Sequence, residues 1–457
     1  MKKNEKYIGV AEGYTNEGAA IVKVDGVVLF VNGLIIGEEA EIAVTAMKKN
    51  YGYARVVKIL KESSHRVEAK CSVSRLCGGC TLQMMDDEAQ KYYKEDKVKN
   101  CFKKNAGIDV DLKPIIRVNP VWNYRNKVQV PVQMRENEVK VGFYRNHSND
   151  VIPFETCMVQ TPCSNDITNF FKKALQKYQC GNVFKHLLIK HAHTTDEVMV
   201  VMIVREYPFN GCEELTKELL QAFPNIKSIE AMVNQREDNV ILDGKEILIY
   251  GQKYIEEELL GCRFRISARS FYQINPYATK ELYSTAIDYA KLTNEDTLID
   301  LYCGTGTMGI IGAKKAKQVY GIEIVADAIK DAQINADENN VHNIEFMNAD
   351  AGKGAQMLIE RNIKANAMIV DPPRKGCSKD TLEAILTIGP ERLVYVSCDP
   401  ATLARDVKFL LENNYKLEIV QPVDMFPQTT HVETVCLLSR EKIDGYINID
   451  LNTEKNR

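Results

Sequence analysis

The chain contains 457 residues, of which 45% are hydrophobic and 26% charged, so it is long enough for two or three domains and has an ordinary soluble composition. Its longest apolar runs fall far short of the roughly 20 residues that a membrane span needs, and its opening residues lack the apolar core of a signal peptide. These features, with a formal net charge of −3, argue against a membrane protein and against a uniformly basic nucleic-acid binder, and they predict a cytoplasmic location.

Residues 1–64 are predicted to form a small β-barrel. From Tyr7 to about Leu60, short β-rich runs such as AAIVKV, VVLFV and AEIAVTA alternate with Gly, Asn and Asp turns and show no helical periodicity. A five-stranded barrel of the oligonucleotide-binding type would remove the exposed edges of so short a sheet. The stretch KKNYGYAR, residues 48–55, interleaves basic residues with tyrosines, which suits phosphate contact and base stacking.

Residues 65–265 have a mixed α+β pattern. A lysine-rich helix is predicted from Asp86 to Asn105, and strands are predicted in KVQVPVQM and EVMVVMIV. Residues 91–127 carry ten Lys or Arg against four acidic residues. Such a stretch favours contact with RNA phosphates, and solvated surface charge is the alternative interpretation.

Residues 266–457 repeat a strand, a turn and a helix. The runs TLIDLYC, QVYGIEI, IEFMNAD, AMIVDPP and RLVYVSC are each followed by a helical stretch, which is typical of a doubly wound, mostly parallel α/β sheet. The final runs, YKLEIVQPVDMF and HVETVCLLSR, have no helix between them. We therefore expect a terminal hairpin inserted into this sheet.

A cysteine cluster opens the central region. Cys71, Cys77 and Cys80 follow a C-x5-C-x2-C spacing, and Cys157 is a distant fourth, with Cys163 as its competitor. In a cytosolic chain, four thiolates suit an iron–sulfur cluster or a structural zinc, and the single C-x2-C pair favours iron–sulfur. The isolated cysteines are interpreted as packing residues: Cys101, Cys180, Cys212, Cys262, Cys303, Cys377 and Cys436.

A glycine-rich turn follows the first strand of the doubly wound region. Its G-x-G-x-x-G pattern, residues 304–309, fits NAD, FAD or S-adenosylmethionine, and Glu323 at the next strand end could bind ribose hydroxyls. Asn348 and Asp350 end the third strand, where an adenine amino group would lie. Asp371 opens DPPRKG after the fourth, and rigid prolines there favour a methyltransferase over a dehydrogenase. The predicted cofactor is S-adenosylmethionine.

Cys398 lies at the end of the fifth strand, on the same open edge as Asp371. A thiolate that adds to C6 of uracil makes C5 nucleophilic enough to accept a methyl group, and a base must then remove the C5 proton. Glu433, at the start of the last strand, is the predicted base, and His431 is its rival.

Together these motifs resemble the RNA uracil-5-methyltransferases, and most of all the iron–sulfur members that modify 23S ribosomal RNA. The resemblance covers nearly the whole chain and rests on CSVSRLCGGCTLQ, SFYQINP, DPPRKG, VSCDPATLARD and HVETV. It implies an N-terminal TRAM barrel, a central iron–sulfur domain and a C-terminal Rossmann-like class I methyltransferase domain. It also implies a transferase that makes 5-methyluridine in RNA, with the target base flipped out of its stack.

The resemblance implies roles for individual residues. Cys398 would be the nucleophile and Glu433 the base. A [4Fe–4S] cluster would be held by Cys71, Cys77, Cys80 and Cys157. S-adenosylmethionine would be contacted by Gln273, Tyr302, Thr307, Glu323, Asp350 and Asp371.

Three other functions compete with this one. A tRNA T-loop methyltransferase would share the mechanism, but such members generally lack the cysteine cluster and the barrel. A radical enzyme would need C-x3-C-x2-C, and a non-catalytic RNA-binding factor would not need Cys398 or Glu433. A monomer is expected, because no long apolar helix face is left without a partner.

Overall fold

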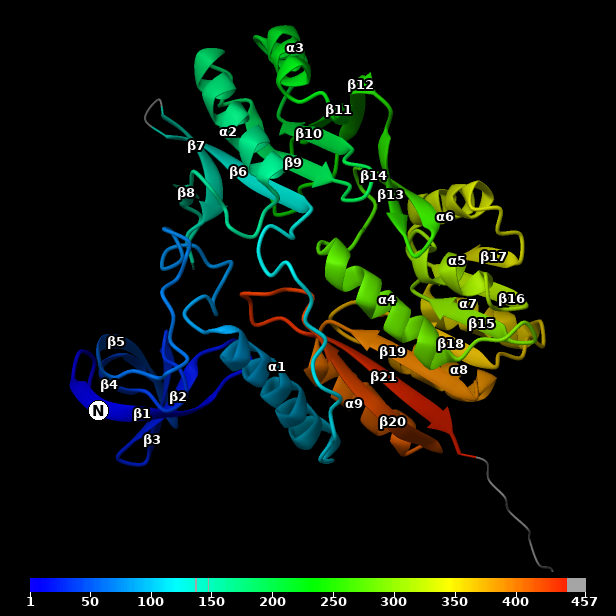
Figure 1. Cartoon of the computed structure of the whole chain (residues 1–457), viewed down its shortest axis with the longest axis horizontal. Helices are drawn as coiled ribbons and strands as arrows, with labels where there is room; N and C mark the ends of the chain where they lie inside the picture. The colour runs from blue at the N-terminus through cyan, green and yellow to red at the C-terminus, as the bar shows by residue number, and fades with distance from the viewer. Residues whose placement is uncertain (136–137, 147, 442–457) are drawn as a thin grey trace, which may run out of the picture.

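The computed structural model describes residues 1–135, 138–146 and 148–441. Figure 1 shows a small barrel at the lower left, a sheet with two helices at the top, and a larger helix-covered sheet at the right and bottom. Within the described residues, no helix combines the length and the apolar character required to cross a bilayer.

The predicted N-terminal barrel is confirmed. Five strands close in the order β1-β2-β3-β5-β4. Their bounds are β1 Lys6–Tyr14, β2 Ala20–Val24, β3 Val27–Asn32, β4 Glu39–Met47 and β5 Tyr51–Lys61. Alternate residues such as Val22, Leu29 and Ile42 point inward and are fully buried, so the period-2 pattern of the sequence forms the barrel core.

The central part is built on a mixed seven-stranded sheet in the order β12-β11-β10-β9-β6-β7-β8. Its strands are β6 Lys127–Arg135, β7 Glu138–Tyr144, β8 Val151–Pro153, β9 Phe184–His191, β10 Val198–Val204, β11 Ile226–Val233 and β12 Lys245–Gly251. Helices α2 (Pro162–Lys177) and α3 (Cys212–Ala222) cover it. Every residue of β10 is buried, as its continuous apolar run predicts.

The C-terminal part contains the predicted doubly wound sheet, in the order β17-β16-β15-β18-β19-β21-β20. Its strands are β15 Thr297–Leu301, β16 Gln318–Glu323, β17 Ile344–Asn348, β18 Ala367–Val370, β19 Arg392–Ser397, β20 Tyr415–Val423 and β21 Glu433–Arg440. The first five are parallel, and β21 enters antiparallel between β19 and β20. The expected terminal hairpin is therefore confirmed.

Helices cover both faces of this sheet. They are α4 Pro276–Ala290, α5 Thr307–Ala313, α6 Ala326–Glu338, α7 Ala351–Glu360, α8 Lys379–Ile388 and α9 Pro400–Leu411. A two-stranded ribbon, β13 Tyr254–Leu259 with β14 Cys262–Ser267, connects the central sheet to α4. Parallel strands bring their carboxyl ends to one edge, so the predicted site residues after β15, β16, β18 and β19 share that edge.

The lysine-rich helix predicted for Asp86–Asn105 forms as α1 (Asp87–Cys101), continued by η1 (Phe102–Ala106), a short π-helix. Asp86 caps it by accepting a hydrogen bond from the Ala89 N–H at 2.9 Å. Phe102 belongs to the same buried cluster as Tyr395 of β19. Helix α1 therefore packs onto the C-terminal sheet, beside α9 in Figure 1.

Candidate functional site

The site centres on the ends of β19 and β21. In this antiparallel pair Ser397 is opposite Thr434, so the next residues along the two strands, Cys398 and Glu433, face each other. Directly opposite residues have Cβ atoms only about 5 Å apart. Cys398 is partly exposed, whereas Glu433 is 4% exposed. The ladder thus juxtaposes a reachable thiol and a buried carboxyl that are 35 residues apart in sequence.

Cys398 also lies just before helix α9, whose first turn is capped by Asp399. The Asp399 Oδ1 accepts hydrogen bonds from the N–H groups of Ala401 at 2.9 Å and Thr402 at 3.4 Å, and Pro400 occupies the first helical position. The sharp exit from strand to helix leaves Cys398 at the open edge.

Helix α9 holds the DPPRKG loop, residues 371–376, against Cys398. The Thr402 hydroxyl donates to the Arg374 carbonyl at 3.1 Å, and the Arg405 guanidinium donates to the Lys375 carbonyl at 2.9 Å. Gly376 has φ +75°, and a Cβ there would come within 2.5 Å of Asp406 Oδ2. The glycine of this motif is therefore required by the close approach of α9.

Asp406 is a buried positioning residue of this loop that the sequence motifs did not single out. Its Oδ2 accepts a hydrogen bond from the Cys377 N–H at 2.8 Å and another from the Tyr395 hydroxyl at 2.6 Å. Tyr395 lies on β19, the strand that ends at Cys398. The Asp406 carboxylate thus joins β19, α9 and the DPPRKG loop.

The carboxyls around Cys398 have raised pKa values. Burial, followed by the charge of Asp371, raises the pKa of Glu433 to about 8, and Arg374 acts in the opposite direction. Burial alone raises the pKa of Asp371 to about 7. Burial and then the charge of Glu433 raise the pKa of the Cys398 thiol to about 11, with Arg374 opposing. Burial destabilises the ionised form of each of these acids. A cation bound at this edge would offset that cost.

His431, the rival base, has a different environment. Burial, together with the positive charges of Arg374, Lys97, Lys94 and Arg125, lowers its pKa to about 4. An imidazole with this pKa is a weak proton acceptor, whereas a carboxylate with a pKa near 8 is a strong one. The electrostatics therefore favour Glu433 over His431.

The glycine-rich turn bends between β15 and α5. Gly304 and Gly306 have φ of +55° and +81°, which favours glycine at both positions. A Cβ on Gly306 would come within 2.9 Å of Phe346, whereas a Cβ on Gly304 would meet nothing within 4 Å. Gly304 therefore faces open space, as a backbone that approaches a ligand should.

Glu323 lies directly across from this turn. Its carboxylate accepts hydrogen bonds from the N–H groups of Gly304 at 3.2 Å and Val325 at 2.8 Å. Each oxygen retains a further lone pair, so the fixed carboxylate could still accept a hydrogen bond from a ribose hydroxyl. Its predicted role fits this geometry.

The remaining predicted cofactor residues surround the same edge. Tyr302 adopts φ +66° after β15, and Thr307 begins α5. Asp350 caps α7 through a 3.1 Å hydrogen bond from Gly352 N–H, and is exposed. Gln273 is 7% exposed and lies against the Tyr283 hydroxyl on α4. Their roles in binding a cofactor stay predictions.

Asp300 is a buried acid at this edge that the motif analysis passed over. Within the described residues neither of its carboxylate oxygens has a side-chain partner, and only the backbone N–H of Gly309 acts to lower its pKa. Burial raises its pKa to about 8, and the charges of Asp371 and Glu323 act in the same direction. In the sequence, the sign of this buried acid is an aspartate inside the otherwise apolar run TLIDLYC. A buried acid that has no cationic partner among the described residues, beside an open glycine turn, fits a cationic ligand such as S-adenosylmethionine.

The four predicted cluster cysteines converge in space. Cys71, Cys77, Cys80 and Cys157 line one cavity of about 340 Å³, together with Tyr124 and Thr429 among other residues. Burial, and next the charge of Cys157, raises the pKa of Cys80 to about 12. Within the described part of the chain, no three Cys, His, Asp or Glu side chains are grouped to hold a single metal ion.

Cys163, the competitor for the fourth position, does not line this cavity. Its sulfur instead accepts a hydrogen bond from the Asn225 amide at 3.8 Å. The isolated cysteines are all buried, which confirms that they are packing residues: Cys101, Cys180, Cys212, Cys262, Cys303, Cys377 and Cys436.

The Asp424–Val432 loop connects the cysteine cavity to Glu433. The Leu82 N–H donates to the Gln428 carbonyl at 3.0 Å, and the Tyr124 hydroxyl donates to the Pro427 carbonyl at 2.9 Å. Thr429 lines the cysteine cavity itself. The segment that leads into the candidate base is therefore fastened to the cysteine-bearing segment.

Helix α1 holds the other end of this loop. The buried Lys94 ammonium pairs with Asp424 and also donates to the Phe426 carbonyl at 2.9 Å, while Arg117 pairs with Asp424 at 2.5 Å. Lys94 and Arg117 both belong to the basic stretch 91–127. For these two residues the predicted RNA contact is replaced by a structural ion pair.

Comparisons with known proteins agree with this geometry. A model of the tRNA (uracil-5-)-methyltransferase family matches residues 88–441. The chain belongs to this family. The methyltransferase is 41% identical over 449 residues to an uncharacterized RNA methyltransferase of Bacillus cereus strain ATCC 10987, covering 96% of this chain and 98% of that one. It is 38% identical over 452 residues to one of Staphylococcus aureus strain MSSA476, covering 96% and 99%.

The fold also matches a solved structure. The methyltransferase resembles the Pyrococcus abyssi tRNA (uracil-54, C5)-methyltransferase in complex with S-adenosyl-L-homocysteine, with a TM-score of 0.75 and 25% identity. The alignment covers 94% of this chain and 99% of that chain. The predicted enzyme class is thus confirmed: the chain is an S-adenosylmethionine-dependent RNA methyltransferase of the uracil-5 family.

Proposed function

We propose that this methyltransferase converts one uridine of 23S ribosomal RNA to 5-methyluridine through a covalent Cys398–uracil adduct. The observation that carries the mechanism is the pairing of Cys398 with Glu433 at the sheet edge that also holds Asp371. A thiol on one side and a strong carboxylate base on the other are the two groups that C5 methylation of uracil requires.

Each step uses a residue of this edge. The Cys398 thiolate adds to C6, and C5 becomes nucleophilic. S-adenosylmethionine, when bound, would supply the methyl group through cleavage of its sulfur–methyl bond, and the electrons of that bond would stay on sulfur as neutral S-adenosylhomocysteine leaves. Glu433 then removes the proton from C5, the C5–C6 double bond re-forms, and the bond from Cys398 to C6 breaks. The positive charge of Arg374, which lowers the pKa of both Cys398 and Glu433, favours their ionised forms.

We also propose that Cys71, Cys77, Cys80 and Cys157 hold a [4Fe–4S] cluster in a central domain of residues 65–265. Four free cysteines around one cavity of about 340 Å³ support this assignment. A cubane spreads its ligands over four corners, so the absence of a single-ion site among the described residues is compatible with it. The cluster would stabilise the Asp424–Val432 loop, with no part in methyl transfer.

Two RNA molecules are candidate substrates, 23S ribosomal RNA and tRNA. The cysteine cavity and the barrel favour ribosomal RNA through the resemblance to the iron–sulfur members. A tRNA T-loop uridine is the second candidate, because a tRNA uracil-54 enzyme aligns with 94% of this chain, barrel and cysteine region largely included. The remaining parts of the proposal are a TRAM barrel in residues 1–64, a methyltransferase domain in residues 266–457, a monomer and a cytoplasmic location.

The experiment is a mass map of 5-methyluridine in ribosomal RNA and tRNA from cells that lack the gene. Loss of the modification at a 23S position supports the proposal, and loss at two positions identifies a dual-site enzyme. Loss only in the tRNA T-loop would overturn the ribosomal substrate and leave the mechanism standing.

A further inference from the structure

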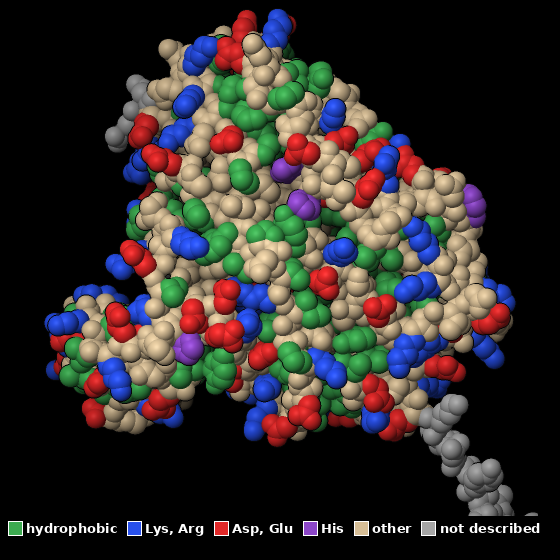
Figure 2. Space-filling view, in the orientation of Figure 1, with side chains coloured by type: hydrophobic (Ala, Val, Ile, Leu, Met, Phe, Trp, Pro, Cys, Tyr) green, Lys and Arg blue, Asp and Glu red, His purple; other side chains and the backbone are tan. Residues whose placement is uncertain are grey.

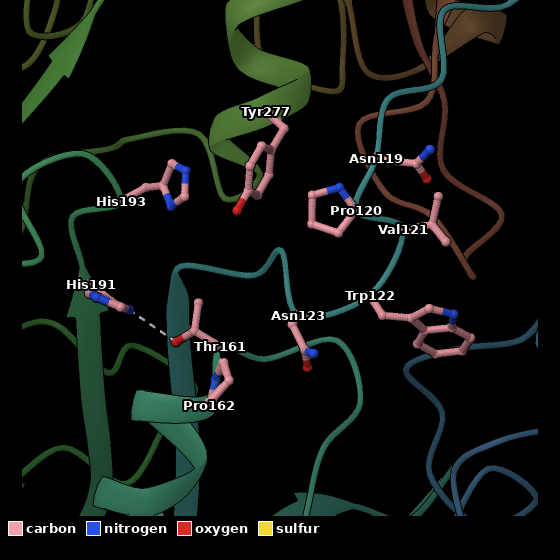
Figure 3. A pocket seen from close by; sticks show the side chains of 10 residues that line it. All are labelled: Asn119, Pro120, Val121, Trp122, Asn123, Thr161, Pro162, His191, His193 and Tyr277. Atoms are coloured by element: carbon pink, nitrogen blue, oxygen red, sulfur yellow. Dashed lines mark hydrogen bonds between the residues drawn. The ribbon is translucent and has the colours of Figure 1, made fainter.

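A second cavity lies where the central sheet meets the catalytic part. It has a volume of about 570 Å³ and is formed by three segments: residues 119–123, the start of α2, and the end of β9 with its following turn. Tyr277, in the first turn of α4, closes it from the catalytic side (Figure 3). We call this cavity the Trp122 pocket. None of the roles predicted from the sequence uses it.

Its lining has the surfaces that bind a planar heterocycle. Tyr277 and His193 present rings to the cavity, Asn119, Asn123 and Thr161 contribute amide and hydroxyl groups, and Trp122 lies at its edge with the ring turned outward. The His193 ring leans on the Tyr277 ring, with centroids 4.5 Å apart and planes inclined by 56°. Rings suit the face of a nucleobase, and amides suit its edge.

The charges around the pocket suit RNA. No lining residue is acidic, but two carboxylates contact the lining: Asp196 is paired with His191 at 2.8 Å, and Glu257 accepts a hydrogen bond from the His193 N–H. The Lys70 ammonium lies 5.2 Å from the centroid of the Trp122 ring. Arg125, two residues beyond Asn123, is exposed. Figure 2 shows histidine side chains at the surface in this junction, with acidic side chains nearby.

The pocket adjoins the candidate active site. Asn126 lies three residues after the pocket wall. Its side-chain amide donates to the Gln273 carbonyl at 3.1 Å, and its backbone N–H donates to the Ile274 carbonyl at 2.9 Å. Gln273 is a predicted cofactor residue, and Tyr277 follows it by four positions. These two hydrogen bonds join the segment of the pocket wall to the predicted cofactor segment.

We propose that the Trp122 pocket binds a second unstacked base of the substrate RNA, close in sequence to the target uridine. This inference rests on RNA being the substrate, and it holds for either RNA candidate. An enzyme that extrudes one base must keep the displaced neighbours from stacking back, and a ring-lined pocket beside the active site does so. It would also select the RNA by its flanking sequence.

The chain itself supplies the probe. Trp122 is the sole tryptophan of the protein, so intrinsic tryptophan fluorescence reports on the 119–123 segment that forms one wall of this pocket. A 23S fragment and a tRNA transcript are each titrated into the full-length protein, first intact and then with single abasic sites on either side of the target. Binding is followed separately by filter retention.

We expect the RNA substrate to quench Trp122 fluorescence, and an abasic site at one position other than the target to abolish the quenching while binding remains detectable. Tyr277→Ala should raise the KM for RNA by roughly 5- to 150-fold, the effect of one lost base stack. The KM for S-adenosylmethionine should stay within twofold of the value for the unsubstituted enzyme, which shows that the variant is folded. Tyr250→Ala, an exposed tyrosine of β12 outside the pocket, is the matched control and should change neither constant.

Three results would overturn the proposal. The first is an RNA that is bound and methylated without any change in Trp122 fluorescence. The second is quenching that disappears only when the target uridine itself is abasic, since the pocket would then hold the target. The third is quenching by a ribosomal protein and not by RNA. Failure of the proposed ribosomal substrate appears differently, as quenching and methylation confined to the tRNA.

Discussion

Cys398 faces Glu433 across the β19–β21 ladder, one pair beyond Ser397 and Thr434. The two side chains come from strands that run in opposite directions, so one strand ends and the other begins at the same point. A uracil bound over this end of the ladder would meet both the thiol and the carboxylate. This relationship makes the roles of the two residues separable by substitution.

Glu433→Gln should stop the reaction after methyl transfer. The glutamine cannot accept the C5 proton, so the methylated RNA should stay bound to Cys398, and turnover should fall by about 10²- to 10⁴-fold. A band of protein joined to RNA on a denaturing gel measures the adduct. Cys398→Ala should give no adduct, and His431→Ala should keep most activity because its pKa of about 4 makes it a poor base. An adduct that accumulates in His431→Ala and not in Glu433→Gln would reverse the assignment.

Binding of S-adenosylmethionine should tighten as the pH rises. Burial raises the pKa of Asp371 to about 7 and of Asp300 and Glu433 to about 8, so these groups are largely protonated at the lower end of the neutral range. A bound sulfonium favours their ionised forms and lowers their pKa values. Protons are therefore released on binding. The affinity rises with pH between about pH 6 and pH 8, up to the pKa values that these carboxyls have in the free protein.

Calorimetry in buffers of different ionisation enthalpy measures this proton release. S-adenosylhomocysteine carries no charge on sulfur and is the matched control, for which the pH dependence should be weaker. Equal proton release by both ligands would show that the raised carboxyls do not respond to the sulfonium.

Lys94→Met should destabilise the fold. The substitution leaves Asp424 buried with only Arg117 as a charged partner, and breaking a buried ion pair costs about 3–5 kcal/mol of the free energy of unfolding. Urea unfolding measures the change. The control is Lys91→Met on the same helix, whose pair with Glu88 is solvent-exposed and should contribute less than about 1 kcal/mol. Equal effects of the two substitutions would contradict the structural role of Lys94.

Cys80→Ser should lose iron, whereas Cys163→Ser should keep it. Cys80 lines the four-cysteine cavity, and Cys163 contacts Asn225 outside it. Iron and acid-labile sulfide are determined after anaerobic purification, with thermal unfolding as a second readout. Zinc in the unsubstituted protein, or iron retained by Cys80→Ser, would reject the proposed cluster.

Local sequence patterns determined the elements of this protein. Alternating apolar residues predicted the barrel strands, and apolar runs followed by Gly304, Asp371 and Cys398 predicted the parallel strands and their shared edge. These predictions succeed because side-chain periodicity and turn chemistry act over a few neighbouring residues. The family resemblance added roles that no periodicity contains.

The tertiary structure decided which distant residues meet. No local pattern sets the register that places Cys398 opposite Glu433, because the pairing of β19 with β21 depends on β21 inserting between β19 and β20. Lys94 looks like a surface cation in its sequence, and only the approach of Asp424 buries it. The raised pKa of Asp300 has the same origin, since burial is a property of the packed molecule and of no single segment.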